Sequence, residues 1–216
     1  MSRPKTRTAL AMLSIPVGIA LTGYLISSSL QLGQLLRIDL ASYAVPSAGL
    51  AIALVCAILL MAGRVRIARR IVILYLVLSA ADLVAGVALL VAGLTSYTGG
   101  EGGTRLLLDS VLLWLSNIQI FALIYWTLDA ALWSPTGVGR RRHFFFPQHV
   151  DKLPGYETWE PSLFSYVYLA FTISTTYGPT DMPATSDTAK ALAMVQAIIA
   201  LALFTLTIAR AVAIIG

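Results

Sequence analysis

Charge is what this sequence has least of: 12% of its 216 residues are charged, whereas 58% are hydrophobic. A soluble domain carries about twice that share of charge. Long stretches hold no charge at all, and about 18 apolar residues in a row can span a hydrocarbon core about 30 Å thick. The composition therefore excludes an ordinary soluble domain and predicts an integral membrane protein.

Cysteine and histidine are nearly absent as well. The single cysteine, Cys56, excludes an intrachain disulfide and lies in an apolar stretch, where we expect a small packing residue. The histidines, His143 and His149, stand in a basic loop without the further nearby ligands that a metal needs. No zinc-protease, nucleophile-elbow or phosphate-loop motif occurs. We therefore predict no enzymatic activity, no catalytic residue, no cofactor and no metal.

The net charge of +5 comes from lysines and arginines in short clusters beside the apolar stretches, which is how membrane proteins fix their orientation. This placement predicts contact with a bilayer and no nucleic-acid partner. Basic residues gather at 3–7, 64–70 and 140–152, and the alternate loops hold few of them. If the basic loops are cytoplasmic, both termini are also cytoplasmic.

Six apolar segments are predicted as helical membrane segments, because backbone polar groups in lipid must be satisfied within a spanning segment. They cover about residues 8–30, 45–63, 71–94, 106–133, 161–177 and 190–215. The expected fold is an all-α integral membrane bundle, with residues 1–216 as a single domain. The basic loop 134–160 also carries three successive aromatics, which we expect in the cytoplasmic headgroup layer: Phe144, Phe145 and Phe146.

Asp82 falls near the middle of the third segment, between alanines, leucine and valine. An ionisable group at that depth costs at least a few kcal/mol unless it is paired, protonated or hydrated. Two interpretations stay open: an ion path or proton relay, and an internal hydrogen bond that locks helices together. The predicted partners are polar residues of the fourth and sixth segments: Asn117, Gln119, Gln196 and Thr205.

Asp129 and Arg210 form a second predicted ionisable pair. Each lies about one turn from the end of its segment, at the ends that six crossings would place on the same side of the membrane. If the two helices are neighbours, the charges can meet, and we expect this pair to be structural.

Residues 166–181 read Y-V-Y-L-A-F-T-I-S-T-T-Y-G-P-T-D. This stretch resembles the pore loop of tetrameric potassium channels, where an aromatic and hydroxyl-rich pore helix leads into T-T-V-G-Y-G-D. Phe171, Thr175, Thr176, Gly178 and Asp181 occupy matching places, and residues 190–216 resemble the inner helix in position and length. The resemblance implies a pore-like vestibule lined by Thr172, Thr175, Thr176, Gly178, Thr180 and Asp181.

The whole chain also resembles, in length and helix pattern, a family of bacterial membrane proteins with no assigned activity. These carry a Y-x-x-F-T signature, then threonine and an S/T-D pair, before their last helix. The likeness implies a cell (inner) membrane location and no mechanism. Against a standard potassium filter, this chain has Pro179 and Thr180 where the filter has tyrosine and its second glycine. Proline fixes φ and threonine disfavours positive φ, so the usual filter geometry is not expected.

The fifth segment, 161–177, is at the lower limit for a span. A re-entrant loop and a full crossing both fit this length, and we favour the crossing because Arg140–Arg142 precede it. A simple turn before the last helix is a third interpretation. Gly178-Pro179 and Met182-Pro183 would punctuate it, and residues 185–187 would cap the helix.

These features predict a channel-like or transporter-like membrane protein that passes a monovalent cation or a proton. A pore of this kind needs symmetry, so the prediction includes a homo-oligomer. The alternative is a non-conducting scaffold or accessory subunit, in which the polar residues serve only helix packing.

Overall fold

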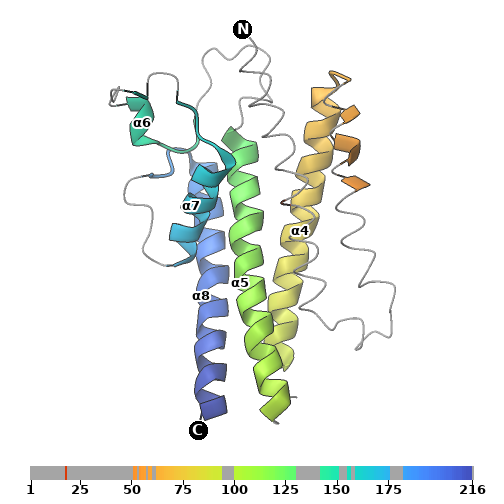
Figure 1. Cartoon of the computed structure of the whole chain (residues 1–216), viewed down its shortest axis with the longest axis vertical. Coiled ribbons are helices and arrows are strands. Elements are labelled where there is room, and N and C mark those ends of the chain that lie inside the picture. Colours follow the sequence, from red (N-terminus) through yellow and green to blue (C-terminus); the bar gives the residue numbers. More distant parts are fainter. Residues whose placement is uncertain are drawn as a thin grey trace.

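The computed structural model describes residues 18, 51–52, 54–56, 58–59, 62–93, 100–129, 142–150, 155–156, 159–175 and 182–215. The predicted first segment, 8–30, lies outside these residues except for Gly18, and the described positions from 51 to 59 are helical. Five helices are labelled in Figure 1: α4 (Val65–Gly93), α5 (Gly100–Asp129), α6 (Pro147–Val150), α7 (Leu163–Ser174) and α8 (Asp187–Ile215). Within the described part, the fold class is therefore all-α, as predicted.

Three of these helices are long and apolar enough to cross a membrane, over Val65–Ala92, Leu107–Asp129 and Asp187–Ala209. They correspond to the predicted third, fourth and sixth segments. The start of α8 has the predicted cap: the Oγ of Ser186 accepts a hydrogen bond from the backbone N–H of Ala189 (3.1 Å). Length and apolar composition thus define the helices that dominate the fold.

The long helices stand side by side, with α5 between α4 and α8 (Figure 1). Half of the apolar window of α5 is buried, against 28% for α4 and 17% for α8, so α5 is the centre of the bundle. The outer faces of its neighbours expose large apolar side chains, such as Leu74 of α4 (60% exposed) and Ile198 of α8 (66% exposed). Apolar outer faces of this kind suit contact with lipid.

Helix α7 does not cross the bundle. It begins beside the end of α5, where the hydroxyl of Tyr166 donates to Asp129 (3.3 Å), and it ends beside Asn117, whose amide donates to Ser174 (3.3 Å). Its 12 residues cover roughly 18 Å at about 1.5 Å per residue, little more than half of a hydrocarbon core about 30 Å thick.

The chain then returns to the end of the bundle from which α7 started. The next described stretch pairs with the loop after α5: the backbone N–H of Thr185 donates to His143 O (2.9 Å), and that of Phe145 donates to Pro183 O (3.0 Å). Within the described residues, α7 therefore runs along about half of α5 and not along the whole bundle, as a full crossing by residues 161–177 would require.

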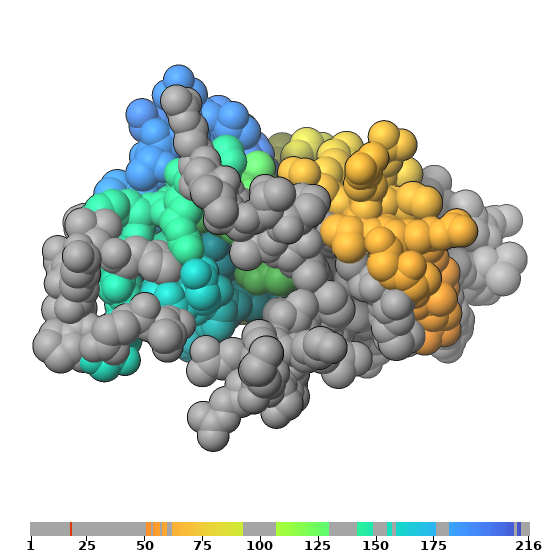
Figure 2. Space-filling model, turned by 90° about the horizontal axis from the view of Figure 1, so that it is seen from above, coloured from red at the N-terminus to blue at the C-terminus, as the bar shows by residue number. Residues whose placement is uncertain are grey.

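We call the end that holds the starts of α4, α7 and α8 and the close of α5 the basic end, because Arg64, Arg66, Arg69, Arg70 and Arg142 lie there. Figure 2 looks down on it, with the start of α4 on one side and segment 142–150 with α7 and α8 on the other. Helix α8 runs away from this end. Its last described residues thus lie at the opposite end of the bundle from these arginines (Figure 1), and the N-terminus lies outside the described residues.

The direction of α8 can be tested by disulfide trapping in a Cys56→Ala background. The Oγ1 of Thr207 donates to the Oγ of Ser110 (2.9 Å), far from the basic end. The pair Ser110→Cys/Thr207→Cys should therefore form a disulfide on oxidation, seen as a linked peptide pair by mass spectrometry. The control pair Ser110→Cys/Ser186→Cys should not. A full crossing by the fifth segment would make α5 and α8 parallel and reverse the two results.

Candidate functional site

The closing turn of α7 lies in a buried polar cluster, which we call the mid-bundle cluster: Asn117, Tyr125, Ser174 and Gln196. Their exposed fractions range from 0% to 3%. The Oγ of Ser174 accepts hydrogen bonds from the Nε2 of Gln196 (2.8 Å) and from the Nδ2 of Asn117 (3.3 Å). Helices α5, α7 and α8 each contribute, so the cluster ties all three together.

Gln196 is the central residue of this cluster. Its Nε2 also donates to the backbone carbonyl of Ala170 (2.8 Å), and its Oε1 accepts from the hydroxyl of Tyr125 (2.6 Å). The indole of Trp114 reaches the carbonyl of Ser174 more weakly (3.5 Å). The last carbonyls of a helix have no partner in the helix itself. The indole of Trp114 in α5 therefore reaches one of these last carbonyls, and Gln196 of α8 adds a bond to Ala170 O, just before them.

One acceptor in the cluster has no partner. The Oδ1 of Asn117 is buried and makes no hydrogen bond within the described part of the chain. An unpaired buried acceptor costs about 1–3 kcal/mol. Asn117 is near the middle of the apolar window Leu107–Asp129. The open acceptor therefore lies at mid-depth, beside the end of α7.

The two described vestibule residues have their hydroxyl protons engaged by α7 itself. Thr172 donates to Leu169 O (2.8 Å), and the Oγ1 of Thr175 lies 3.1 Å from both Phe171 O and Thr172 O. The hydroxyl oxygen of Thr172 can also accept a hydrogen bond. The other four predicted vestibule residues lie outside the described residues: Thr176, Gly178, Thr180 and Asp181.

Asp129 is 7% exposed and has two partners at the basic end. Its Oδ1 accepts from the backbone N–H of His143 (2.7 Å), and its Oδ2 accepts from the hydroxyl of Tyr166 (3.3 Å). This carboxylate therefore joins α5, the following loop and the first turns of α7.

The predicted pairing of Asp129 with Arg210 is wrong. The side chain of Arg210 lies outside the described residues, but its backbone in α8 follows Thr207, which bonds Ser110 (2.9 Å). Ser110 and Asp129 are roughly 28 Å apart along α5 at about 1.5 Å per residue. The pairing depended on parallel α5 and α8, and these helices are antiparallel.

Asp82 lies near the middle of α4 and is exposed. The residues predicted as its partners are used elsewhere: Asn117 and Gln196 in the mid-bundle cluster, and Gln119 as a donor to Gly18 O (2.9 Å). The hydroxyl of Thr205 donates within α8 to Leu201 O (2.8 Å).

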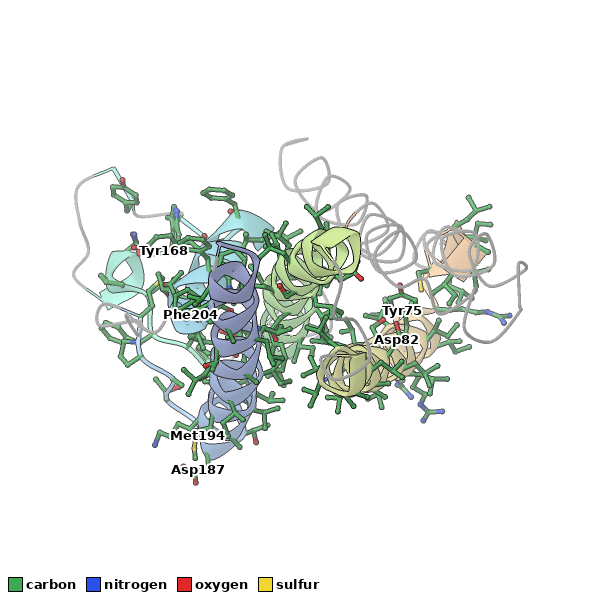
Figure 3. All side chains as sticks on the ribbon, turned by 90° about the horizontal axis from the view of Figure 1, so that it is seen from below. Tyr75, Asp82, Tyr168, Asp187, Met194 and Phe204 are labelled. Atoms are coloured by element: carbon green, nitrogen blue, oxygen red, sulfur yellow. The ribbon has the colours of Figure 1, made fainter. Side chains whose placement is uncertain are left out.

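Figure 3 shows Asp82 beside Tyr75 on one face of α4, away from the labelled residues of α7 and α8. Asp82 is therefore separate from the mid-bundle cluster.

The aromatics of loop 134–160 are not all at the surface. Phe144 and Phe146 are 1% and 2% exposed, and both rings meet Tyr166 edge-on, at 6.4 Å and 5.4 Å between centroids. Both rings therefore pack inside the protein, and the position of the loop in the headgroup layer stays a prediction. They fill the space above the mid-bundle cluster, where Phe144 also contacts Tyr125 (4.8 Å).

Sequence reasoning missed Tyr125, Tyr166 and His143. Tyr125 and Tyr166 are amphipathic residues in apolar helices, and a tyrosine buried at such a depth normally finds a hydrogen-bond partner for its hydroxyl. That rule could have selected both. His143 could not have been found, because its backbone N–H bonds Asp129 and its Nδ1 lies 2.6 Å from the Oγ of Ser186 only once the loop has folded back.

The fold and the cluster define a helical, apolar bundle with one half-length helix whose end is held by buried polar side chains. No protein-family model, curated protein or solved structure matches this chain.

The role of Gln196 predicts a specific loss of stability. Gln196→Leu leaves the hydroxyl of Tyr125 without its acceptor and Ser174 without the shorter of its two donors, so the free energy of unfolding should fall by roughly 1–3 kcal/mol. Thermal unfolding in detergent measures this. The matched control in the same helix is Thr205→Val, because that hydroxyl bonds only a carbonyl of α8 and is exposed. Equal losses in the two variants would contradict a central role for Gln196.

Proposed function

We propose that this chain is an integral membrane protein of the channel-like or transporter-like class, and that α7 with the following residues is a re-entrant hairpin. The observation that carries the proposal is the end of α7 at mid-depth, where side chains of α5 and α8 bond Ala170 O and Ser174 O. Irregular backbone at membrane depth is tolerated where protein buries it or where it lines a watery cavity. Half-length helices in transporters and channels use this arrangement at their ion sites.

The chemistry around this helix end favours a cation. The carbonyl end of a helix carries partial negative charge, and the unpaired Oδ1 of Asn117 lies beside it. The hydroxyl of Thr172 adds an acceptor. In sequence, the vestibule residues Thr176, Gly178, Thr180 and Asp181 follow directly. The proposed permeant species is a monovalent cation or a proton.

The likeness to a potassium-channel pore loop supports a re-entrant hairpin but not a potassium filter. Pro179 and Thr180 stand where the filter needs a tyrosine and a glycine. The vestibule we propose would therefore bind its ion through side-chain oxygens and the end of α7. No enzymatic reaction is part of the proposal.

Asp82 supports a homo-oligomer. A carboxylate on the exposed face of a membrane helix costs at least a few kcal/mol when lipid surrounds it. A second copy of the chain packed against α4 would shield Asp82 and make it an intramembrane ionisable site, close to the subunit boundary. A symmetric assembly is also what a pore-like vestibule needs.

The charge pattern orients the proposed protein in the cell (inner) membrane. The arginines of the basic end support a cytoplasmic position for that end. Helix α7 then enters from the cytoplasmic side and returns to it, whereas α8 crosses and leaves the C-terminal end of the chain outside.

A non-conducting scaffold is the second candidate. Its support is that Tyr125, Ser174 and Gln196 bond one another, as residues that only join helices would do. In that case the half-length helix would be a rigid plug that shapes the bundle for a partner membrane protein.

Flux through proteoliposomes separates the two candidates. Under imposed sodium, potassium or proton gradients, the wild-type protein should carry a flux that Asp181→Asn and Asp82→Asn lower by about tenfold, the effect of about 1.4 kcal/mol on a barrier. Thr175→Val should act in the same direction, because it removes a hydroxyl at the end of α7. Ion-sensitive dyes inside the vesicles report the rates.

The matched controls for flux are Asp187→Asn and Thr205→Val, which change an exposed carboxylate and an exposed hydroxyl of α8. Both should leave the flux as it is. Absence of flux for all three ions, together with a stable complex with another membrane protein, would reject the channel-like proposal and favour the scaffold.

A further inference from the structure

The start of α4 carries four arginines that belong to no ion pair within the described part of the chain. All four are exposed: Arg64, Arg66, Arg69 and Arg70. The ion pairs described at the basic end use other cations, because Arg142 bonds Glu160 (2.9 Å) and Lys190 lies 3.5 Å from Asp187. The first turn of α4 also holds no acidic residue. The start of α4 is therefore a cationic surface whose charge the described residues leave unbalanced.

Three of these residues share one side of α4, which we call the arginine face: Arg66, Arg69 and Arg70. Positions i, i+3 and i+4 of a helix are neighbours on its surface. The next turns of the same face expose between 42% and 60% of three large apolar side chains: Ile73, Leu74 and Val77. The buried Val72 and Leu76 mark the side toward the bundle, and Asp82 lies about 120° further round the helix than Arg70. The arginine face thus has charge at its start and apolar surface directly beyond it.

The length of α4 puts these guanidinium groups at the membrane surface. The stretch that is long and apolar enough to cross a membrane begins at Val65, before the arginines, and ends at Ala92. Residues 71–92 alone cover roughly 33 Å at about 1.5 Å per residue, which is enough for a hydrocarbon core about 30 Å thick. The first turns of α4 are therefore not needed for the span. Their long arginine side chains can reach phosphate groups while the next turns contact acyl chains.

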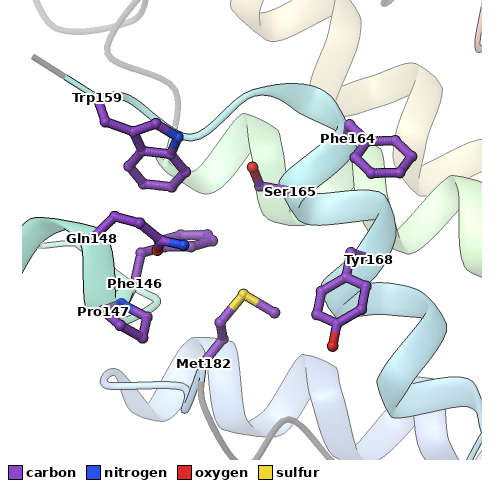
Figure 4. Close-up of a pocket in the computed structure, with 8 residues that line it drawn as sticks. All are labelled: Phe146, Pro147, Gln148, Trp159, Phe164, Ser165, Tyr168 and Met182. Carbon is purple, nitrogen blue, oxygen red and sulfur yellow. The ribbon is translucent and has the colours of Figure 1, made fainter. Parts of the chain in front are cut away.

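The pocket beside α7 offers no comparable charge. It has a volume of about 240 Å³, and Figure 4 shows Phe164 and Tyr168 of α7 on the opposite side of it from Trp159. None of its lining residues is charged. Figure 2 shows the start of α4 on one side of the basic end and α7 on the other. The arginine face is therefore separate from this pocket.

Guanidinium groups above an apolar surface select an anionic phospholipid. A guanidinium can donate two parallel N–H bonds to phosphate oxygens, and clusters of basic residues beside a membrane helix attract anionic lipid. An acidic protein segment would use the arginines alone, whereas Ile73 and Leu74 continue the face into the acyl region. A zwitterionic lipid brings its own cation, which the arginines repel. A phospholipid with a net negative headgroup satisfies both parts of the face.

We propose that the arginine face binds one anionic phospholipid of the phosphatidylglycerol type. Its phosphate lies between Arg66 and Arg70, with Arg69 beside them, and its acyl chains run along Leu74 and Val77. This inference rests on the membrane location in the proposed function but not on the ion flux. A protein that carries no flux can therefore still show the lipid site, whereas a protein that stays soluble without detergent would lack both.

Headgroup selectivity of the wild-type protein is the first test. The full chain in detergent is titrated with dioctanoyl phosphatidylglycerol, phosphatidylethanolamine or phosphatidylcholine, and native mass spectrometry counts the bound lipids. We expect one saturable phosphatidylglycerol, and binding of the two zwitterionic lipids that is weaker by about tenfold or more. Inorganic phosphate should compete poorly, because it has no acyl chains. Equal affinity for the three lipids, or displacement of the lipid by phosphate or by polyglutamate at equal charge, would overturn the proposal.

Matched removal of charge tests the arginine face itself. Arg66→Gln/Arg70→Gln should weaken phosphatidylglycerol binding by about twentyfold, since each basic residue near a membrane surface contributes about fivefold. The control Arg142→Gln/Lys190→Gln removes the same net charge from the same end, but from cations that are already in ion pairs. It should change the affinity by less than about twofold. Equal losses in the two double variants would show that net charge alone attracts the lipid, and would reject a site on α4.

The acyl part of the site is tested on two outer faces of the bundle. Leu74→Ala shortens the apolar surface beyond the arginines and should weaken phosphatidylglycerol binding by about threefold. Ile198→Ala is the matched control, because Ile198 is comparably exposed on α8 (66% against 60%) and no arginine stands at the start of that helix. Equal effects of the two variants, with unchanged melting temperatures in detergent, would contradict acyl chains on the arginine face.

Discussion

The structure depends on one constraint: a helix that ends inside an apolar bundle must find partners there for its last carbonyls. The indole of Trp114 reaches Ser174 O (3.5 Å), and the backbone N–H of Thr175 bonds Phe171 O (3.0 Å). The amide of Gln196 adds bonds to Ala170 O and Ser174 Oγ, while the hydroxyl of Tyr125 holds its oxygen (2.6 Å). Side chains of α5 and α8 thus hold the end of the half-length helix.

A second fixed point holds the other end of α7. Asp129 bonds the hydroxyl of Tyr166 and the backbone N–H of His143, and the residues after His143 pair with the chain that returns toward α8. The start of α7, the loop and the start of α8 are therefore held together at the basic end. With both ends fixed, α7 has one available depth and one orientation against α5.

The sequence was sufficient for the long helices, because an apolar run of more than about 20 residues has few alternatives to a spanning helix. It was not sufficient for α7. Seventeen apolar residues are compatible with a crossing or a half crossing, and only Gln196, distant in the chain, decides between them. A full crossing by the fifth segment would make α8 parallel to α5. The predicted pairing of Arg210 with Asp129 depended on that direction.

The individual site residues also differ in how much of their role the sequence alone could predict. Asp82 was found from local sequence, since a carboxylate among alanines is conspicuous in an apolar helix, but its predicted partners bond elsewhere. Phe144 and Phe146 looked like headgroup anchors because aromatics often are. They are buried because the loop folds back over α7, and loop folding of this kind depends on contacts between segments distant in the chain.

The order of the elements along the chain has a consequence for biosynthesis. Helix α7 is translated before α8, so it emerges when α5 is already present but Gln196 is not. Until α8 arrives, Ala170 O and Ser174 Oγ lack the bonds from Gln196, and a polar helix end at mid-depth is unfavourable in lipid. The hairpin can settle only after the last helix has inserted. Translation of the final residues of this chain therefore also completes the burial of a segment made well before them.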